Sequence, residues 1–376
     1  MPNDLAAGMA AWRHYLHSHP ELSRQEVETS AYIAAQLASL GIPHWGGIGG
    51  YGIVAQLARG KGPRVGLRAD MDALPIHENT GAPHASRRAG VMHACGHDGH
   101  AASLLGAAQI LRDDPDWSGT INFIFQPAEE GFGGAEAMLA DGLLTRFPMD
   151  SIFGYHNWPG LPVGTVALHD GPVMAAAANF SIILHGRAGH AGMPHLTADP
   201  VQGLAHIIVA LNTITARSAN PLEAAVISTC TLSAGEARNQ IPASASASGT
   251  MRALLPETMA LLQTRMEEIV RHTAAAHLLE PELEIFGGLA ATINHAQSVP
   301  LAVAAAQKAG CIVRRDMAPS MAAEDFGRFL QEIPGAYAWI GNGTSAPLHN
   351  PDYDYNDAIL PIAARYLTHT AKAALA

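Results

Sequence analysis

The sequence predicts an α/β protein of two domains, in which one α/β domain is interrupted by a smaller inserted domain. Strand and helix signals alternate in the outer parts of the chain, whereas the middle follows the order β, α, β, β, α, β. A chain of 376 residues with 48% hydrophobic residues can bury a large core, and its length favours two domains over one.

The outer parts of the chain carry the signals of a sheet covered by helices. Ser23 to Glu26 form a capping-box pattern before a helical stripe that Gly41 ends. The apolar run of small residues at 101–112 predicts a helix that packs on a sheet. Four short runs rich in branched or aromatic residues predict buried strands, at residues 53–58, 64–70, 120–126 and 151–156. Polar residues lie at the ends of these strands, where we expect the chemistry.

The inserted domain is expected over residues 175–293, and the remainder, 1–174 and 294–376, is expected to form one discontinuous α/β domain. Proline-led helix starts are predicted within the insertion at Pro200 and Pro256. An apolar helical stripe follows the first of them, formed by Val201, Leu204, Ile208 and Leu211.

Composition and charge exclude several classes of protein. A net charge of −11 without any basic run argues against a nucleic-acid-binding surface. No stretch approaches the roughly 20 consecutive apolar residues that span a bilayer, and the N-terminus lacks the basic and apolar regions of a secretory signal. The three cysteines form neither a CxxC pair nor a disulfide framework. We therefore expect a cytoplasmic protein that binds neither membrane nor nucleic acid.

Metal-ligand residues are concentrated in one segment of the chain. The segment MHACGHDGH, residues 92–100, holds one cysteine and three histidines. Cys95 and His97 can meet one divalent ion, and the lone pairs left on a thiolate make Cys95 a candidate bridge to a second ion. Further polar candidates follow downstream, namely Glu129, Glu130, His156 and His349. This set of residues indicates a metal-dependent hydrolase.

Seven motifs that occur in order over nearly the whole chain resemble those of the M20 metallopeptidase family. They are RADMDALP (68–75), MHACGHDGH, FQPAEEG (125–131), GYHNWP, GRAGHAGMPH, GTMR and LHNPDYDYND. More narrowly, they resemble the amidohydrolase branch, which holds hippurate hydrolases, N-acyl-amino-acid deacylases and auxin-conjugate hydrolases. The resemblance implies a catalytic domain with two metal ions, and an inserted βαββαβ lid domain that also dimerises.

The resemblance assigns roles within the catalytic domain. The implied metal ligands are Cys95, His97, Glu130, His156 and His349, a set that suits Zn²⁺, Mn²⁺, Co²⁺ or Ni²⁺. Glu129 is implied to be the general acid/base, which takes a proton from metal-activated water and gives it to the leaving nitrogen. Asp70 is expected to hydrogen-bond to a metal-binding histidine from behind, and the shares of Asp72 and Asp98 in that function stay open. Arg68 stands where other branches of the family have a histidine ligand.

Three residues of the inserted domain are implied in handling the substrate. His190 resembles the lid histidine that reaches across a dimer to the partner's active site and stabilises the oxyanion. Asn239 and Arg252 resemble the residues that bind the substrate's carboxylate, for which arginine has the fork geometry. We therefore expect a homodimer, or a tetramer, that assembles through the lid domain.

The expected function is hydrolysis of the amide bond of N-acyl or N-aroyl amino acids, such as hippurate-like or N-acetyl substrates. Two alternatives stay open on the same scaffold: a metallo-dipeptidase, and a deacetylase of the N-acetyl-diaminopimelate type. A pocket preference for a free α-amine or a second carboxylate would reveal either of them. A non-catalytic binding protein is the third class, and the presence of every candidate ligand together with the base argues against it.

Overall fold

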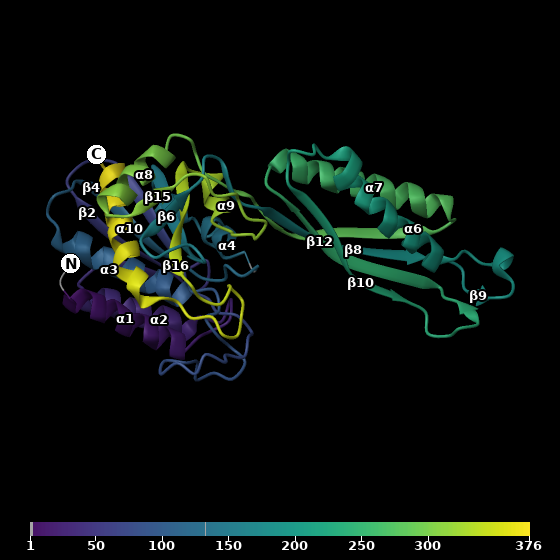
Figure 1. The fold of residues 1–376 in the computed structure, drawn as a ribbon, viewed down its shortest axis with the longest axis horizontal. Helices are drawn as coiled ribbons and strands as arrows, with labels where there is room; N and C mark the ends of the chain where they lie inside the picture. The colour runs from purple at the N-terminus through teal and green to yellow at the C-terminus, as the bar shows by residue number, and fades with distance from the viewer. Residues whose placement is uncertain (1–2, 132) are drawn as a thin grey trace. The chain divides into compact units, whose positions relative to one another are not determined.

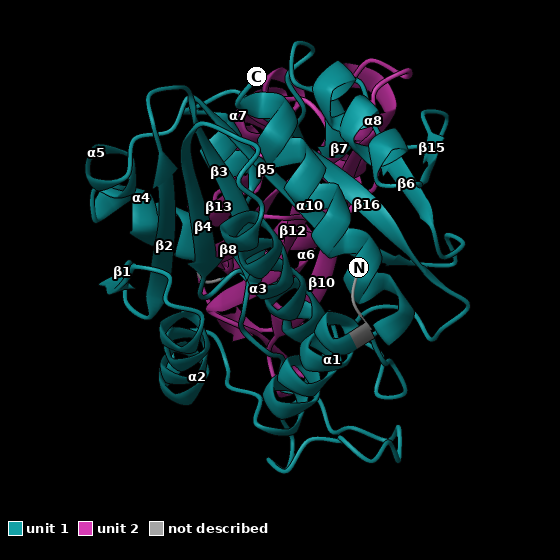
Figure 2. Cartoon of the chain, turned by 90° about the vertical axis from the view of Figure 1, so that its left-hand side faces the viewer, with its two compact units in different colours: residues 1–173, 292–318, 325–376 teal, residues 174–291, 319–324 magenta. Residues whose placement is uncertain are grey.

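The chain divides into two compact units, which Figure 2 shows in different colours. The computed structural model describes residues 3–131 and 133–376. Unit 1 consists of Met1–Val173, Thr292–Ala318 and Asp325–Ala376, and unit 2 consists of Met174–Ala291 and Pro319–Glu324. Each unit combines a sheet with helices, which confirms the predicted α/β class.

Unit 1 is organised around a mixed sheet. Within the described residues its eight strands follow the order β1-β2-β4-β3-β5-β16-β6-β15. Figure 1 labels β2, β4, β6, β15 and β16 of this sheet. Their bounds are β1 (His44–Ile48), β2 (Gly52–Arg59), β3 (Arg64–Asp70), β4 (Gly119–Gln126), β5 (Ser151–Pro159), β6 (Thr165–Leu168), β15 (Ile312–Arg314) and β16 (Gly335–Gly343). The strands β4, β3, β5 and β16 are parallel neighbours, so their carboxyl ends meet at one edge of the sheet.

Helices pack on this sheet, and Figure 2 shows α1, α3 and α10 side by side against it. The helices of unit 1 are α1 (Asn3–Ser18), α2 (Val27–Ser39), α3 (His97–Asp113), α4 (Gly134–Ala140), α5 (Leu143–Arg146), α8 (Val299–Lys308), α9 (Gly327–Leu330), η3 (Asp357–Ile359) and α10 (Leu360–Ala374). Leu67 of β3 lies in one apolar core with Leu104 of α3 and Leu367 of α10. Because successive strand residues alternate between faces, Arg68 points to the opposite side of the sheet.

The start of α2 differs from the predicted capping box. The helix begins at Val27, and the side chain of the preceding Glu26 does not cap it. In the first turn, the Thr29 N–H donates to Glu21 Oε2 at 2.8 Å. The Ser23 hydroxyl donates instead to Asp72 Oδ2 at 2.6 Å. A tertiary partner therefore replaces the local one that the sequence pattern predicted.

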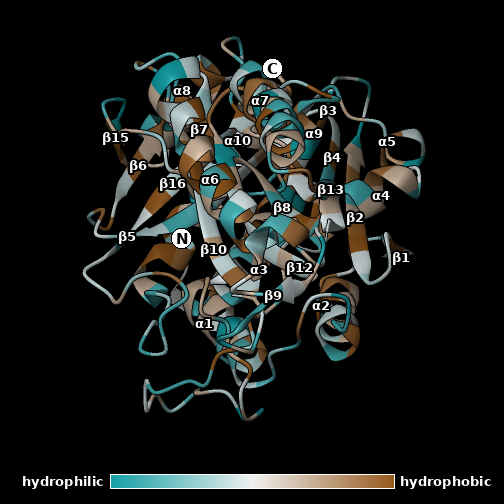
Figure 3. Cartoon of the chain, turned by 90° about the vertical axis from the view of Figure 1, so that its right-hand side faces the viewer, coloured by the Kyte–Doolittle hydropathy of each residue, from teal (hydrophilic) through white to brown (hydrophobic). Residues whose placement is uncertain are grey.

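Unit 2 has the predicted order β, α, β, β, α, β among its main elements. Its four-stranded antiparallel sheet runs in the order β10-β12-β8-β13. The main elements are β8 (Ala176–His185), α6 (Pro200–Thr213), β10 (Ala225–Ala234), β12 (Ser244–Ala253), α7 (Pro256–Ala276) and β13 (Glu280–Leu289), and the short ones are β9 (Gly189–His190), η1 (Pro194–Leu196), η2 (Ile214–Ser218) and β11 (Gln240–Ile241). In Figure 3, hydrophobic and hydrophilic residues alternate around α7, as on a helix with one face packed on a sheet.

Local sequence signals explain the two long helices of unit 2. Both α6 and α7 begin at the predicted prolines, and the Asp199 carboxylate accepts from the Val201 and Gln202 N–H groups at the start of α6. The buried face of α6 includes Leu204 and Leu211 of the predicted stripe, whereas Val201 is exposed. Among the described residues, every helix is too short or too polar to span a bilayer.

The chain leaves unit 1 and returns to it through two adjacent strands. Strand β7 (Pro172–Met174) pairs with β14 (Thr292–Ile293). The segment between them forms most of unit 2. His349 therefore follows the insertion in sequence, although it belongs to the same unit as Cys95.

Candidate active site

The loop that carries Cys95 and His97 depends on the glycine between them. Gly96 has a φ of 90° and directly precedes α3. A Cβ atom at this position would lie 2.4 Å from Asn157 Nδ2 and 2.7 Å from the Tyr353 hydroxyl oxygen. Asn157 Nδ2 donates to the Cys95 carbonyl oxygen at 2.7 Å. The close approach of Asn157 therefore requires glycine and fixes the loop on which the thiol lies.

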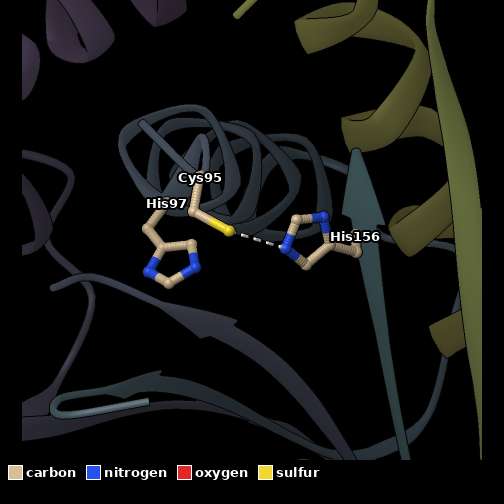
Figure 4. Close-up of side chains that lie close together, drawn as sticks. All are labelled: Cys95, His97 and His156. Atoms are coloured by element: carbon tan, nitrogen blue, oxygen red, sulfur yellow. Dashed lines mark hydrogen bonds between the residues drawn. The ribbon is translucent and has the colours of Figure 1, made fainter. Parts of the chain in front are cut away.

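Cys95, His97 and His156 bring one sulfur and two imidazoles together (Figure 4). One ligand atom from each lies within 4.8 Å of the others, and Cys95 Sγ is 3.3 Å from His156 Nε2. The Nδ1 atoms of His97 and His156 lie 2.9 Å from the Asp72 carbonyl oxygen and 2.7 Å from the Asn157 carbonyl oxygen. Both Nδ1 atoms are thereby committed as donors, which leaves the Nε2 lone pairs for a cation.

Cys95 also belongs to a second group, with Glu130 and His349. His349 lies in the loop after β16 with a φ of 62°, and its backbone N–H donates to the Ala94 carbonyl oxygen at 2.8 Å. Its Nε2 atom is 3.4 Å from Glu130 Oε1. The structure thus brings together all five expected metal ligands, with Cys95 common to both groups.

The adjacent glutamates Glu129 and Glu130 have different surroundings. Glu129 Oε1 accepts from the Asp325 backbone N–H at 3.3 Å, and Glu129 Oε2 lies 3.9 Å from His97 Nε2. The residue before them, Ala128, has a φ of 55°, and its N–H donates to Glu26 Oε1 at 2.8 Å. Glu130 Oε1 lies 3.8 Å from the same His97 Nε2 atom and 3.4 Å from His349 Nε2. The two carboxylates therefore share His97 as a neighbour and differ in their second neighbour, which is the Asp325 N–H for Glu129 and His349 for Glu130.

The carboxylates behind the histidines differ from the expectation for Asp70. Asp72, through its carbonyl oxygen and its carboxylate, accepts from His97, whereas Asp70 Oδ1 accepts from His100 Nδ1 at 2.6 Å. The other ring nitrogen of His100 accepts from the Asn157 N–H at 3.0 Å. Both nitrogens of His100 are therefore occupied, and this ring supports its neighbours rather than offering a ligand atom.

The electrostatics of this cluster fit a divalent cation. Burial, together with the Glu129 and Glu130 carboxylates, raises the pKa of the Cys95 thiol. Although burial favours a neutral ring, the Asp70 and Asp72 carboxylates raise the pKa of His97 to about 10. Among the described residues, its buried Nε2 atom has no hydrogen-bond partner. The surrounding carboxylates thus favour positive charge at His97, and a divalent cation beside its unpaired Nε2 atom would meet the same requirement.

Comparison with known proteins identifies the family. The sequence model of peptidase family M20/M25/M40 matches residues 66–373, which is most of the chain. The chain belongs to this family. M20 relatives include the N-acetyl-L-cysteine deacetylase of Bacillus subtilis, 39% identical over 96% of this chain and 86% of the relative. The hippurate hydrolase of Campylobacter jejuni is 38% identical over 98% of this chain and 97% of the relative.

A solved M20 structure gives the same result at the level of the fold. A Bacillus subtilis protein, described as a dinuclear metal-binding peptidase of the M20 family, superposes with a TM-score of 0.88. It is 34% identical, and the match covers 99% of each chain. The α/β architecture with an inserted unit is therefore that of an M20 enzyme.

The remaining expected site residues of this M20 chain lie in unit 2. His190 is in β9, paired with Gln240 of β11, and the Ala191 N–H donates to the Asn239 carbonyl oxygen at 3.0 Å. His190 and Asn239 are thus neighbours in one small hairpin. Arg252 lies in β12 and is half-buried, and burial lowers its pKa. Among the described residues, its guanidinium has no hydrogen-bond or salt-bridge partner.

Asn157 is the functional residue that sequence reasoning missed. It holds both the Cys95 carbonyl oxygen and His100, and it accepts from the Tyr353 hydroxyl at 2.5 Å. The only signal was its place inside the motif GYHNWP, directly after the candidate ligand His156. Nothing in an isolated asparagine indicates that it joins two loops of an M20 metal site.

Proposed function

We propose that this chain is a metal-dependent amidohydrolase that releases amino acids from N-acyl or N-aroyl amino acids. The observation that carries the proposal is Cys95, shared by two groups of candidate ligand atoms, with Glu129 beside them. The names of the relatives, a deacetylase of N-acetyl-L-cysteine and a hippurate hydrolase, support the same class of substrate. A dipeptidase or a deacetylase of N-acetyl-diaminopimelate type is the alternative on the same scaffold.

The donor atoms suit two divalent ions per subunit, and we propose Zn²⁺, Mn²⁺, Co²⁺ or Ni²⁺. Cys95, His97 and His156 would hold one ion, and Cys95, Glu130 and His349 the other. When bound, such ions polarise the scissile carbonyl and lower the pKa of the attacking water. A cytoplasmic location is part of the proposal, because Cys95 must remain reduced to act as a ligand.

Glu129 performs the proton transfers in this proposal. The Asp325 N–H holds Oε1, which turns Oε2 toward His97 and the metal ligands. Oε2 accepts the proton of water as the oxygen attacks the amide carbon, and it then delivers this proton to the leaving nitrogen. The C–N bond breaks, and the products are a carboxylic acid and a free amino acid.

A substrate panel tests the proposal. Purified, metal-stripped protein is incubated with N-acetyl amino acids, hippurate, dipeptides and N-acetyl-diaminopimelate, with each of the four metals added back, and release of free amine is measured. Metal-dependent release from acylated amino acids is the expected result. Cleavage confined to dipeptides or to the diaminopimelate derivative would establish the corresponding alternative, and no release with metal bound would refute amide hydrolysis of this class.

Arg252 is proposed to bind the substrate's free carboxylate, since its half-buried guanidinium lacks a partner among the described residues. Arg252→Met is expected to raise KM by roughly 10- to 100-fold, as for the loss of a charge-assisted hydrogen bond. The effect should vanish for a substrate whose carboxylate is an amide. Arg265→Met, on the exposed side of α7, is the control and should leave KM unchanged. An equal KM for Arg252→Met and the parent would exclude this role. Asn239 is proposed to assist at the same carboxylate.

We propose a homodimer or tetramer formed through unit 2, in which His190 acts on the active site of the partner. Two inactive variants, His190→Ala and Glu129→Gln, are mixed after partial unfolding and allowed to reassemble. A mixed dimer would combine intact His190 from one subunit with intact Glu129 from the other, so hydrolysis should return. Each variant taken through the same procedure alone is the control. Hydrolysis that stays absent in the mixture would show that His190 acts within its own subunit or not at all.

A further inference from the structure

Arg68 is a buried cation that the proposed mechanism does not use. Its side chain is fully buried on β3. Nη1 donates to Asp70 Oδ2 at 2.8 Å, Nη2 donates to Asp325 Oδ1 at 2.9 Å, and Nε donates to Gln126 Oε1 at 2.8 Å. All three nitrogens of the guanidinium are thus engaged by fixed partners. Because the planar guanidinium donates in fixed directions, it orients the groups that accept from it and also neutralises the charge of the two carboxylates.

Asp325 connects this cation to the proposed base. Its carboxylate also accepts from Gln126 Nε2 at 2.8 Å and from the Ala135 N–H at 2.9 Å. Its backbone N–H is the donor to Glu129 Oε1. The Asp325 side chain is therefore clamped by groups on β3, β4 and α4, while its main chain holds Glu129.

We propose that Arg68 is a positioning residue that orients the carboxylate of Glu129 through Asp325. This inference rests on the proposed function only where it is tested by measuring hydrolysis rates. The three side chains that Arg68 binds at 2.8 to 2.9 Å, those of Asp70, Gln126 and Asp325, are not among the five candidate ligands. Arg68 holds the Asp325 carboxylate at the end of β4. The backbone N–H of Asp325 is thereby fixed in the position from which it donates to Glu129. A shift of about 1 Å in a proton-transfer group can cost about 100-fold in rate.

Two variants separate the parts of this connection. Arg68→Met removes the cation and keeps an unbranched apolar chain. Asp325→Asn keeps the shape of the carboxylate but removes its charge and with it the ion pair to Arg68. Both are expected to lower kcat by about 100-fold with KM and metal content unchanged. Arg68→Lys keeps the charge but cannot donate in three directions, so its kcat should lie between those of the parent and Arg68→Met.

A double-mutant cycle with Glu129→Gln distinguishes positioning from general damage. If Arg68 acts through Glu129, Arg68→Met should have no further effect on the residual rate of the Glu129→Gln protein. The same loss in both backgrounds would overturn the proposal. Leu111→Ala is the matched control for lost stability, because Leu111 is fully buried and lies about 21 Å along α3 from His97. This variant should unfold earlier on heating and keep the parent's kcat.

Crystal structures of the metal-loaded parent and of Arg68→Met provide a second test, which does not depend on enzymatic activity. The Glu129 carboxylate is expected to leave the Asp325 N–H in the variant, with Cys95 and Glu130 in place. A Glu129 carboxylate that stays on the Asp325 N–H would overturn the proposal. Should Arg68→Met fail to fold, Asp325→Asn takes its place in both tests. If the parent hydrolyses nothing in the substrate panel, the proposed function fails, and the crystallographic test still decides whether Arg68 positions Glu129.

Discussion

Glu129→Gln is expected to lower amide hydrolysis by about 10²- to 10⁴-fold while the protein keeps its bound metal. Glutamine has nearly the shape of glutamate but cannot take a proton from water at neutral pH. Its amide oxygen can still accept from the Asp325 N–H, as Glu129 Oε1 does at 3.3 Å. The measurements are kcat with hippurate or an N-acetyl amino acid, and metal content by elemental analysis of the same preparation.

The neighbouring residue provides the control for this prediction. Glu130→Gln should lose metal, because Glu130 belongs to a group of candidate ligand atoms with Cys95 and His349. Loss of metal from Glu129→Gln, with retention by Glu130→Gln, would mean that the two carboxylates have the opposite functions. Retention of full activity by Glu129→Gln would remove it from the mechanism altogether.

Cys95→Ser is expected to abolish hydrolysis and to reduce the metal content at both positions. Cys95 is the one residue common to the two groups that contain His156 and His349, so its loss affects both. A serine hydroxyl does not ionise near neutral pH, and it offers a harder and weaker donor than a thiolate. Titration of the metal-free protein with Zn²⁺ or Mn²⁺ measures the number of ions bound.

The other cysteines serve as controls. Cys230 is exposed on β10, and Cys311 lies outside every described group of candidate ligands. Cys230→Ser and Cys311→Ser should bind as many ions as the parent protein. A Cys95→Ser protein that binds two ions with the parent's affinity would contradict a bridging thiolate and leave His97, His156, Glu130 and His349 as the ligand set.

The sequence allows prediction of those features that depend on local pattern. The order of elements in unit 2 follows from periodicity and from Pro200 and Pro256, and the structure confirms both helix starts. The apolar pattern of α6 does not determine which of its members are buried, since Val201 belongs to the stripe but is exposed. An apolar residue at the edge of a helical stripe keeps the spacing of the stripe, although its side chain can lie outside the buried face.

Features that depend on distant partners could not be predicted. Ser23 has the pattern of a helix cap, but its hydroxyl meets Asp72, 49 positions further along the chain. Asp70 and Asp72 are equivalent in a strand-end motif, and only the fold shows that the first supports His100 and the second His97. Asn157 of β5 likewise donates to the Cys95 carbonyl oxygen, 62 positions earlier in the chain.

The position of β16 has a consequence for the order in which the protein is made. This strand lies between β5 and β6, pairs with both, and begins at Gly335, after the entire insertion has been synthesised. A nascent chain that ends before Gly335 therefore has β5 without its neighbour on that side, and β6 has no strand that joins it to β5. Such unpaired edges are the surfaces on which incomplete chains associate. Chains stalled late in translation should for this reason need the help of chaperones more than chains that have just been completed.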